Sequence, residues 1–118
     1  MPTILVAEDA QFVRMRISQL LSEHNYNVVE AKDGEEAIQT YCHIKPDVVL
    51  MDVAMPVKDG LIALSEIRRF DPQAKIIMLT ALSQHAFVLR AMQAGAKDFL
   101  IKPYDPEQLL LVLQKVLD

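Results

Sequence analysis

Five side chains that could bind a cation or a charged group follow short apolar runs of the sequence: Glu8, Asp9, Asp52, Thr80 and Lys102. Two unit charges about 4 Å apart repel by about 4 kcal/mol at an effective dielectric of about 20, so neighbouring carboxylates need a positive partner. Lys102 supplies one positive charge, and Mg²⁺, which prefers oxygen ligands, would supply two more. Any one of these acids alone is explained as an ordinary loop residue. Five such side chains, each at the end of an apolar run, predict a magnesium site.

The apolar runs that precede these side chains predict five β-strands. Four are nearly unbroken, which is typical of strands buried on both faces of a parallel sheet. The second is shorter and indicates an edge strand. The runs are Ile4–Ala7, Val28–Val29, Val48–Met51, Ile76–Leu79 and Phe99–Ile101.

Segments of helical period separate the strands, the first over about Ala10–His24 and the third over about Lys58–Phe70. Gly95 is typical of the residue just past a helix end, and Asp105 with Pro106 is typical of a helix start. Five strand–helix units predict a (βα)₅ doubly wound α/β sandwich of the flavodoxin-like kind, with five parallel strands in the order 2-1-3-4-5. Ligands of such sheets bind beyond the carboxyl ends of the strands.

The composition fits one globular domain spanning residues 1–118. The chain has 118 residues, a net charge of -4 and one cysteine, Cys42. The mild acidity argues against direct nucleic-acid binding, and the single thiol fits a reducing, cytoplasmic setting. Its first apolar run is too short for a signal peptide, and no run is long enough for a membrane helix, so we expect no membrane association.

The motifs at the strand ends resemble those of response regulator receiver domains of two-component signalling. Residues 52–60 match the run D-x-x-M-P-x-x-D-G of that family. Glu8-Asp9, Thr80-Ala81 and Lys102-Pro103 match it in order and approximate spacing. The resemblance covers the whole chain, and the segment Ala94–Phe99 is similar to stand-alone chemotaxis-type receivers.

The resemblance implies a role for each acid. Asp52 would be the phosphoacceptor, taking a phosphoryl group from a phosphohistidine on a sensor histidine kinase or phosphotransfer protein. Asp9 and Asp52 would bind Mg²⁺ directly, the backbone carbonyl of Ala54 would be a third protein ligand, and Glu8 would act through water. Many family members have aspartate in place of Glu8, but the longer arm still suits an outer-sphere role.

The resemblance also implies a switch. Lys102 would pair first with Asp52 and then with a phosphoryl oxygen, and Thr80 would bind the phosphoryl group. Inward movement of Thr80 would free space for Phe99, the family's switch aromatic, which here lacks a hydroxyl. The face formed by the fourth helix, fifth strand and fifth helix would then bind a downstream target or an output domain, and a homodimer formed on phosphorylation stays open.

The resemblance implies a phosphoacceptor that assists its own phosphorylation, rather than an enzyme with a separate substrate. Ala54 and Leu82 occupy the positions that tune phosphoryl lifetime in the family. Both are apolar and poorly suited to orient an attacking water, so we expect slow autodephosphorylation.

Other functions compatible with the same sheet fit the sequence less well. A flavodoxin-like electron carrier needs a phosphate-binding loop where Glu8 and Asp9 would repel the phosphate. An aspartyl-phosphate phosphatase needs a second acid where Ala54 stands, and the nucleotide-binding glycine motifs are missing. A structural module with no phosphoryl chemistry remains the third alternative.

The last helical segment has more apolar residues than one buried face needs. Leu109, Val112, Leu113 and Val116 form a normal buried stripe, which Leu110 and Leu111 widen. The wider stripe indicates either a broad buried face or contact with a partner, and the sequence leaves both open.

Overall fold

Five parallel strands form the centre of the protein, in the order β2-β1-β3-β4-β5. The computed structural model describes residues 1–81, 83 and 86–118. Its sheet confirms the predicted strand number, direction and order. The strands are β1 (Thr3–Ala7), β2 (Asn27–Ala31), β3 (Val48–Asp52), β4 (Ile76–Ala81) and β5 (Asp98–Lys102).

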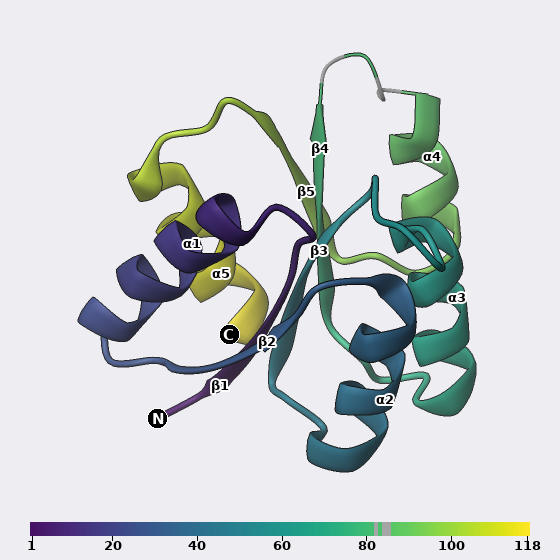
Figure 1. Cartoon of the computed structure of the whole chain (residues 1–118), viewed down its shortest axis with the longest axis horizontal. Helices are drawn as coiled ribbons and strands as arrows, with labels where there is room; N and C mark the ends of the chain where they lie inside the picture. Colours follow the sequence, from purple (N-terminus) through teal and green to yellow (C-terminus); the bar gives the residue numbers. More distant parts are fainter. Residues whose placement is uncertain (82, 84–85) are drawn as a thin grey trace.

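Helices cover both faces of this sheet, as Figure 1 shows. One face packs against α1 (Gln11–Glu23) and α5 (Pro106–Leu117), and the other against α2 (Gly34–Ile44), α3 (Gly60–Phe70) and α4 (Ala86–Gln93). The arrangement is the predicted doubly wound sandwich. No helix in the described part of the chain is both long and apolar enough to span a membrane.

Two apolar cores lie on opposite faces of the sheet because successive side chains of a strand point to opposite sides. In β1, Ile4 and Val6 pack with α1 and α5, whereas Leu5 and Ala7 pack with the helices of the other face. All four side chains are fully buried. Burial on both faces explains why the predicted strands are apolar at every position rather than at alternate ones.

Capping interactions set where the helices begin and end. The Asp59 side chain accepts the Ile62 N–H at 2.9 Å, so α3 begins at Gly60, two residues after the predicted start. Gly95 has a φ of 107° and ends α4 as predicted. Its N–H donates to the Met92 carbonyl at 3.1 Å, which satisfies a carbonyl of the last turn.

The two additional leucines of α5 lie in different environments. Leu110 is half-buried and packs against the core beneath α1 and α5. Leu111 is 67% exposed. Only Leu110 therefore belongs to the broad buried face, and Leu111 is free to contact a partner.

Gly60 is required where the chain returns past the end of β3. Its N–H donates to the Val53 carbonyl at 2.8 Å. A Cβ added to Gly60 would lie 2.1 Å from the main-chain oxygen of Asp52, which cannot move without moving β3. The glycine therefore lets α3 begin directly against the strand that carries Asp52.

We expect Gly60→Ala to destabilise the fold. At an open helical position alanine would be the more stable residue by about 0.5–1 kcal/mol, but the clash with the main chain costs about 1–3 kcal/mol and reverses the sign. Urea unfolding would measure the difference. Ser65→Ala, on the exposed side of the same helix, is the control and should leave the free energy of unfolding nearly unchanged. Equal stability of Gly60→Ala and the parent would show that the close approach is not rigid.

Candidate functional site

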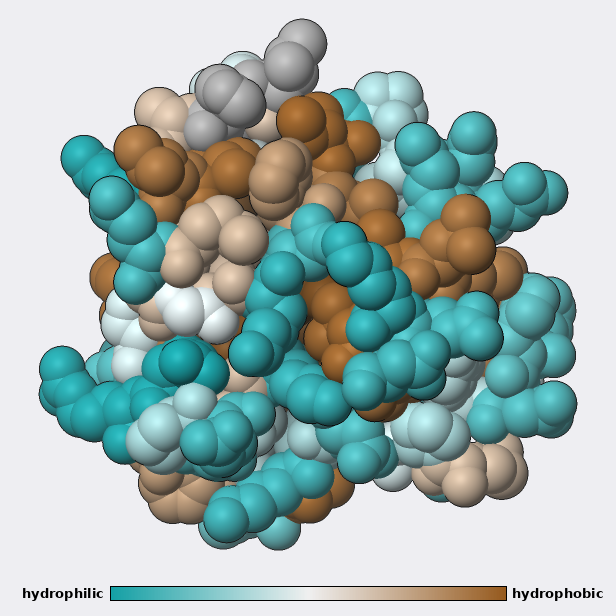
Figure 2. Space-filling model, turned by 180° about the vertical axis from the view of Figure 1, so that it is seen from behind, coloured by the Kyte–Doolittle hydropathy of each residue, from teal (hydrophilic) through white to brown (hydrophobic). Residues whose placement is uncertain are grey.

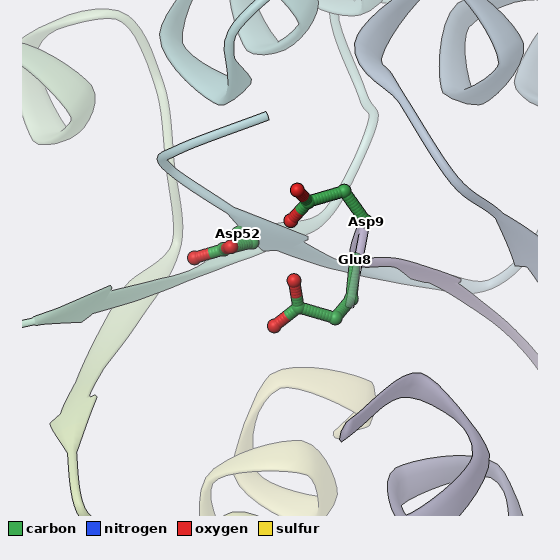
Figure 3. A group of neighbouring side chains, drawn as sticks. All are labelled: Glu8, Asp9 and Asp52. Atoms are coloured by element: carbon green, nitrogen blue, oxygen red, sulfur yellow. The ribbon is translucent and has the colours of Figure 1, made fainter. Parts of the chain in front are cut away.

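Three carboxylates meet at the carboxyl end of the sheet, as the sequence predicted. Glu8 and Asp9 follow β1, and Asp52 is the last residue of β3, the adjacent strand. Each offers an oxygen, and the three oxygens lie within 4.8 Å of one another. Figure 3 shows Glu8 and Asp9 extending to opposite sides of the chain, with both carboxylates turned toward Asp52.

Lys102 supplies the positive charge of this cluster. From the end of β5, its Nζ donates to Asp52 Oδ1 at 3.1 Å and to Glu8 Oε1 at 3.2 Å. Partial burial of Lys102 acts to lower its pKa, but the negative charges of Asp52 and Glu8 outweigh this effect and raise the pKa above its ordinary value. Lys102 is therefore held as the ammonium.

Glu8 is more firmly held than an outer-sphere ligand needs to be. Its side chain is only 2% exposed and contacts Lys102 through one oxygen, while the other oxygen accepts the Ala10 N–H at 3.2 Å. The additional methylene of glutamate gives the carboxylate the reach for the lysine contact. The sequence predicted only a water-mediated contact between Glu8 and a metal. The structure adds an ion pair between Glu8 and Lys102.

Asp9 is the exposed member of the cluster. Partial desolvation, together with the hydrogen bond and negative charge of Glu8, raises the pKa of Asp9 above its ordinary value. A nearby cation would relieve this repulsion. The donor set consists of carboxylate oxygens alone, two of them on buried side chains, which fits a hard divalent cation such as Mg²⁺.

Thr80 and Phe99 lie on neighbouring strands beside the cluster. Thr80, on β4, is fully buried, and its hydroxyl donates to the Ala81 carbonyl at 3.1 Å. Phe99, on β5, is half-buried against the core beneath α2, α3 and α4. In the register of the two strands, Phe99 is opposite Met78, two residues before Thr80.

The loop from β3 to α3 places Ala54 at the exposed rim of the cluster. Lys58 anchors this loop by ion pairs to Glu35 of α2 and Glu66 of α3, each at 2.9 Å. Val57, between Ala54 and Lys58 in this loop, has a φ of 68°. A left-handed conformation costs a β-branched residue about 1–2 kcal/mol, so the anchored loop holds a strained backbone at the site.

Sequence reasoning missed two basic residues near the cluster. The ion pairs of Lys58 join three separate segments of the chain, and no spacing rule predicts them. Arg14 of α1 donates to the main-chain carbonyl of Glu8 at 2.7 Å. In the sequence, Arg14 cannot be told apart from Arg16, an exposed arginine of the same helix, so the contact could not be predicted. The predicted residues Glu8, Asp9, Asp52 and Lys102 do lie together.

Comparisons with known proteins agree with this geometry. The chain matches the response regulator receiver domain model over residues 4–114. It is 45% identical to protein CcdB of Bacillus subtilis, covering 99% of this chain and 98% of the relative. It is 43% identical to the chemotaxis protein CheY of Thermotoga maritima, covering 96% and 95%.

Solved structures give the same result. The receiver domain of NtrX from Brucella abortus superposes with a TM-score of 0.92 at 28% identity, over 97% of each chain. The response regulator domain of Thermotoga maritima CheB superposes with a TM-score of 0.90 at 32% identity, covering 99% of this chain and 96% of that chain. Sequence, sheet order and the acidic cluster agree, and this chain belongs to the response regulator receiver domain family as a CheY-like member.

Proposed function

We propose that this receiver domain accepts a phosphoryl group on Asp52 from a phosphohistidine of a sensor histidine kinase or phosphotransfer protein. The observation that carries the proposal is the position of Asp52 at the end of β3, 3.1 Å from Lys102 and within the carboxylate cluster. Asp52 is 4% exposed, beside the exposed residues Asp9 and Ala54, so a small group approaches it from the rim. The single thiol supports a cytoplasmic setting for this reaction.

The transfer needs little besides positioning and charge neutralisation. An oxygen of the Asp52 carboxylate forms a bond to phosphorus as the phosphorus–nitrogen bond of the donor breaks, and the donor imidazole keeps the electron pair. Mg²⁺ bound by Asp9, Asp52 and the Ala54 carbonyl, with Glu8 acting through water, would offset the charge of the phosphoryl oxygens. Lys102 then exchanges its contact with Asp52 for one with a phosphoryl oxygen. The chain assists its own phosphorylation and does not turn over a separate substrate.

Phosphorylation of Asp52 would change the positions of Thr80 and Phe99, and through them the surface of the domain. Thr80 turns its hydroxyl from the Ala81 carbonyl to the phosphoryl group, and Phe99 moves into the space released. The affected face contains α4, β5 and α5, on which several large apolar side chains are exposed. They are Phe87, Leu89 and Met92 of α4 and Leu111 of α5.

Figure 2 shows apolar surface at the end of the molecule where α4 lies. An exposed apolar surface of this kind suits contact with another protein. We propose that a downstream target or an output domain binds there. A second copy of this chain, joined on phosphorylation, is the alternative occupant.

Incubation with Mg²⁺ and acetyl phosphate, followed by intact-mass measurement, tests the phosphoacceptor. We expect the parent to gain one phosphoryl group. Asp52→Asn should abolish the gain, because the amide is not a nucleophile, and omission of Mg²⁺ should abolish it as well. Asp47→Asn is the matched control, since Asp47 lies just before the opposite end of the same strand. An unmodified parent, or a phosphorylated Asp52→Asn variant, would favour a purely structural module instead.

We expect the phosphoryl group to persist for minutes or longer once the phosphodonor is removed. The exposed Ala54 cannot orient an attacking water, and the second apolar residue of this prediction, Leu82, lies outside the described residues. Ala54→Gln places an amide at the rim and should shorten the half-life several-fold. A phosphate-release time course measures both proteins, and loss from the parent within seconds would contradict the prediction.

Thr80→Ala should separate phosphorylation from the movement of Phe99. The variant keeps Asp52 and Lys102, so it should still gain a phosphoryl group, but it lacks the hydroxyl that draws β4 toward the site. Fluorine NMR of protein labelled with fluorophenylalanine reports the switch, with Phe99→Leu identifying the signal of that ring. We expect this signal to shift on phosphorylation in the parent and to stay in place in Thr80→Ala. Equal shifts in both proteins would exclude Thr80 as the link.

A further inference from the structure

We propose that Arg14 is a positioning residue that holds the peptide unit between Glu8 and Asp9, and thereby sets the affinity of the site for Mg²⁺. Arg14 lies in the first turns of α1 and does not contact any of the three clustered carboxylates among the described residues. The inference rests on the proposed function, because it assigns to Arg14 a part in building the metal site that phosphorylation requires.

The guanidinium of Arg14 joins two strand ends. One terminal nitrogen donates to the Glu8 carbonyl after β1 at 2.7 Å, and Nε donates to Glu30 Oε1 of β2 at 2.8 Å. Its side chain is only 15% exposed, so the contact with the Glu8 carbonyl is partly protected from solvent, whereas the contact with Glu30 lies at the surface. The planar fork of donors makes both contacts at once, which the single ammonium of lysine would do with poorer geometry.

With Arg14 in place, every polar group of Glu8 has a partner. The N–H donates to the Ala31 carbonyl at 3.0 Å, and the carboxylate accepts from Ala10 and Lys102. Because a peptide unit is planar, holding the Glu8 carbonyl also fixes the nitrogen and Cα of Asp9, the atoms from which its side chain extends.

Asp9 depends on this backbone support. In the described part of the chain its carboxylate forms no ion pair, whereas Glu8 and Asp52 are both held by Lys102. The other contacts of the Asp9 carboxylate are local, with Glu8 and with the main chain at Asp9 and Ala10, so its position follows that of the main chain. Loss of Arg14 would therefore loosen the one exposed carboxylate assigned to direct metal contact.

Simple charge effects predict the opposite result. Arg14 is positive, so its removal from the neighbourhood of a cation site should strengthen Mg²⁺ binding if only long-range attraction and repulsion mattered. The positioning role predicts weaker binding. The sign of the change therefore separates the two explanations.

Arg14→Met tests the inference against Arg16→Met, which removes the same charge from the same helix. Arg16 is exposed and lies over the Phe12 ring at 5.7 Å, away from the Glu8 carbonyl. Titration calorimetry gives the Mg²⁺ dissociation constant, and the Mg²⁺ dependence of phosphorylation by acetyl phosphate gives the half-saturating concentration and the limiting rate.

We expect Arg14→Met to raise both the dissociation constant and the half-saturating concentration about 10-fold, the lower end of the range for residues that orient metal ligands. The limiting rate at saturating Mg²⁺ should stay close to that of the parent, because Asp52 and Lys102 are unchanged. Arg14→Lys should recover part of the affinity, and Arg16→Met should leave it unchanged or slightly stronger. Glu30→Asp, which keeps the negative charge but shortens the side chain that anchors Arg14, should shift the affinity in the same direction by a smaller factor and serves if Arg14→Met does not fold.

An unchanged or stronger Mg²⁺ affinity in Arg14→Met would overturn the inference, and so would a fall in limiting rate with no change in half-saturation. In the event that Arg14→Met does not fold, an unchanged affinity in Glu30→Asp would do the same. If the parent binds Mg²⁺ but takes up no phosphoryl group, the proposed function fails while the calorimetric comparison still decides the role of Arg14.

Discussion

The concentration of negative charge at one end of the sheet is the constraint on which the rest of this structure depends. Three carboxylates with oxygens within 4.8 Å of one another cannot be accommodated in a partly buried site without positive charge. Lys102 offsets part of this charge by contacting both buried acids. The remaining charge makes the cluster suitable for a cation, and the exposed Asp9, which has no ion pair among the described residues, would gain from one.

The parallel sheet is what brings these charges together. Parallel strands present all their carboxyl ends at one edge, so residues at the ends of β3 and β5 and just after β1 become neighbours despite separations of tens of residues in the chain. Two cores, one on each face, hold the strands so that the register cannot shift without exposing apolar side chains. The two cores therefore also hold in place the strand ends that carry the acidic cluster.

The loops around the site are held by contacts of their own. Gly60 permits α3 to begin against β3, and Lys58 joins the β3–α3 loop to α2 and α3. Arg14 performs a similar task on the other side, between β1 and β2. Strain at Val57 is tolerated within this frame, because the contacts around it fix the loop.

The sequence by itself determined the five strands, their order and the identity of the clustered residues. Apolar runs, helical periods and end signals such as Gly95 and Asp105 are local, so they can be recognised from neighbouring residues alone. The motif of residues 52–60 then placed Asp52 at a strand end. Helix boundaries were less certain, and α3 begins at Gly60 because the Asp59 side chain caps it there.

Only the tertiary structure decided how the charges are paired. Whether Glu8 contacts Lys102, whether Arg14 reaches a main-chain carbonyl and whether Leu110 or Leu111 is buried depend on side-chain rotamers and on distances between segments far apart in the chain. Such contacts arise after the elements have packed, because a side chain selects its partner from whatever groups packing has brought within reach. The chemistry of this site could therefore be recognised from its residue types, while the support that holds it in place could not.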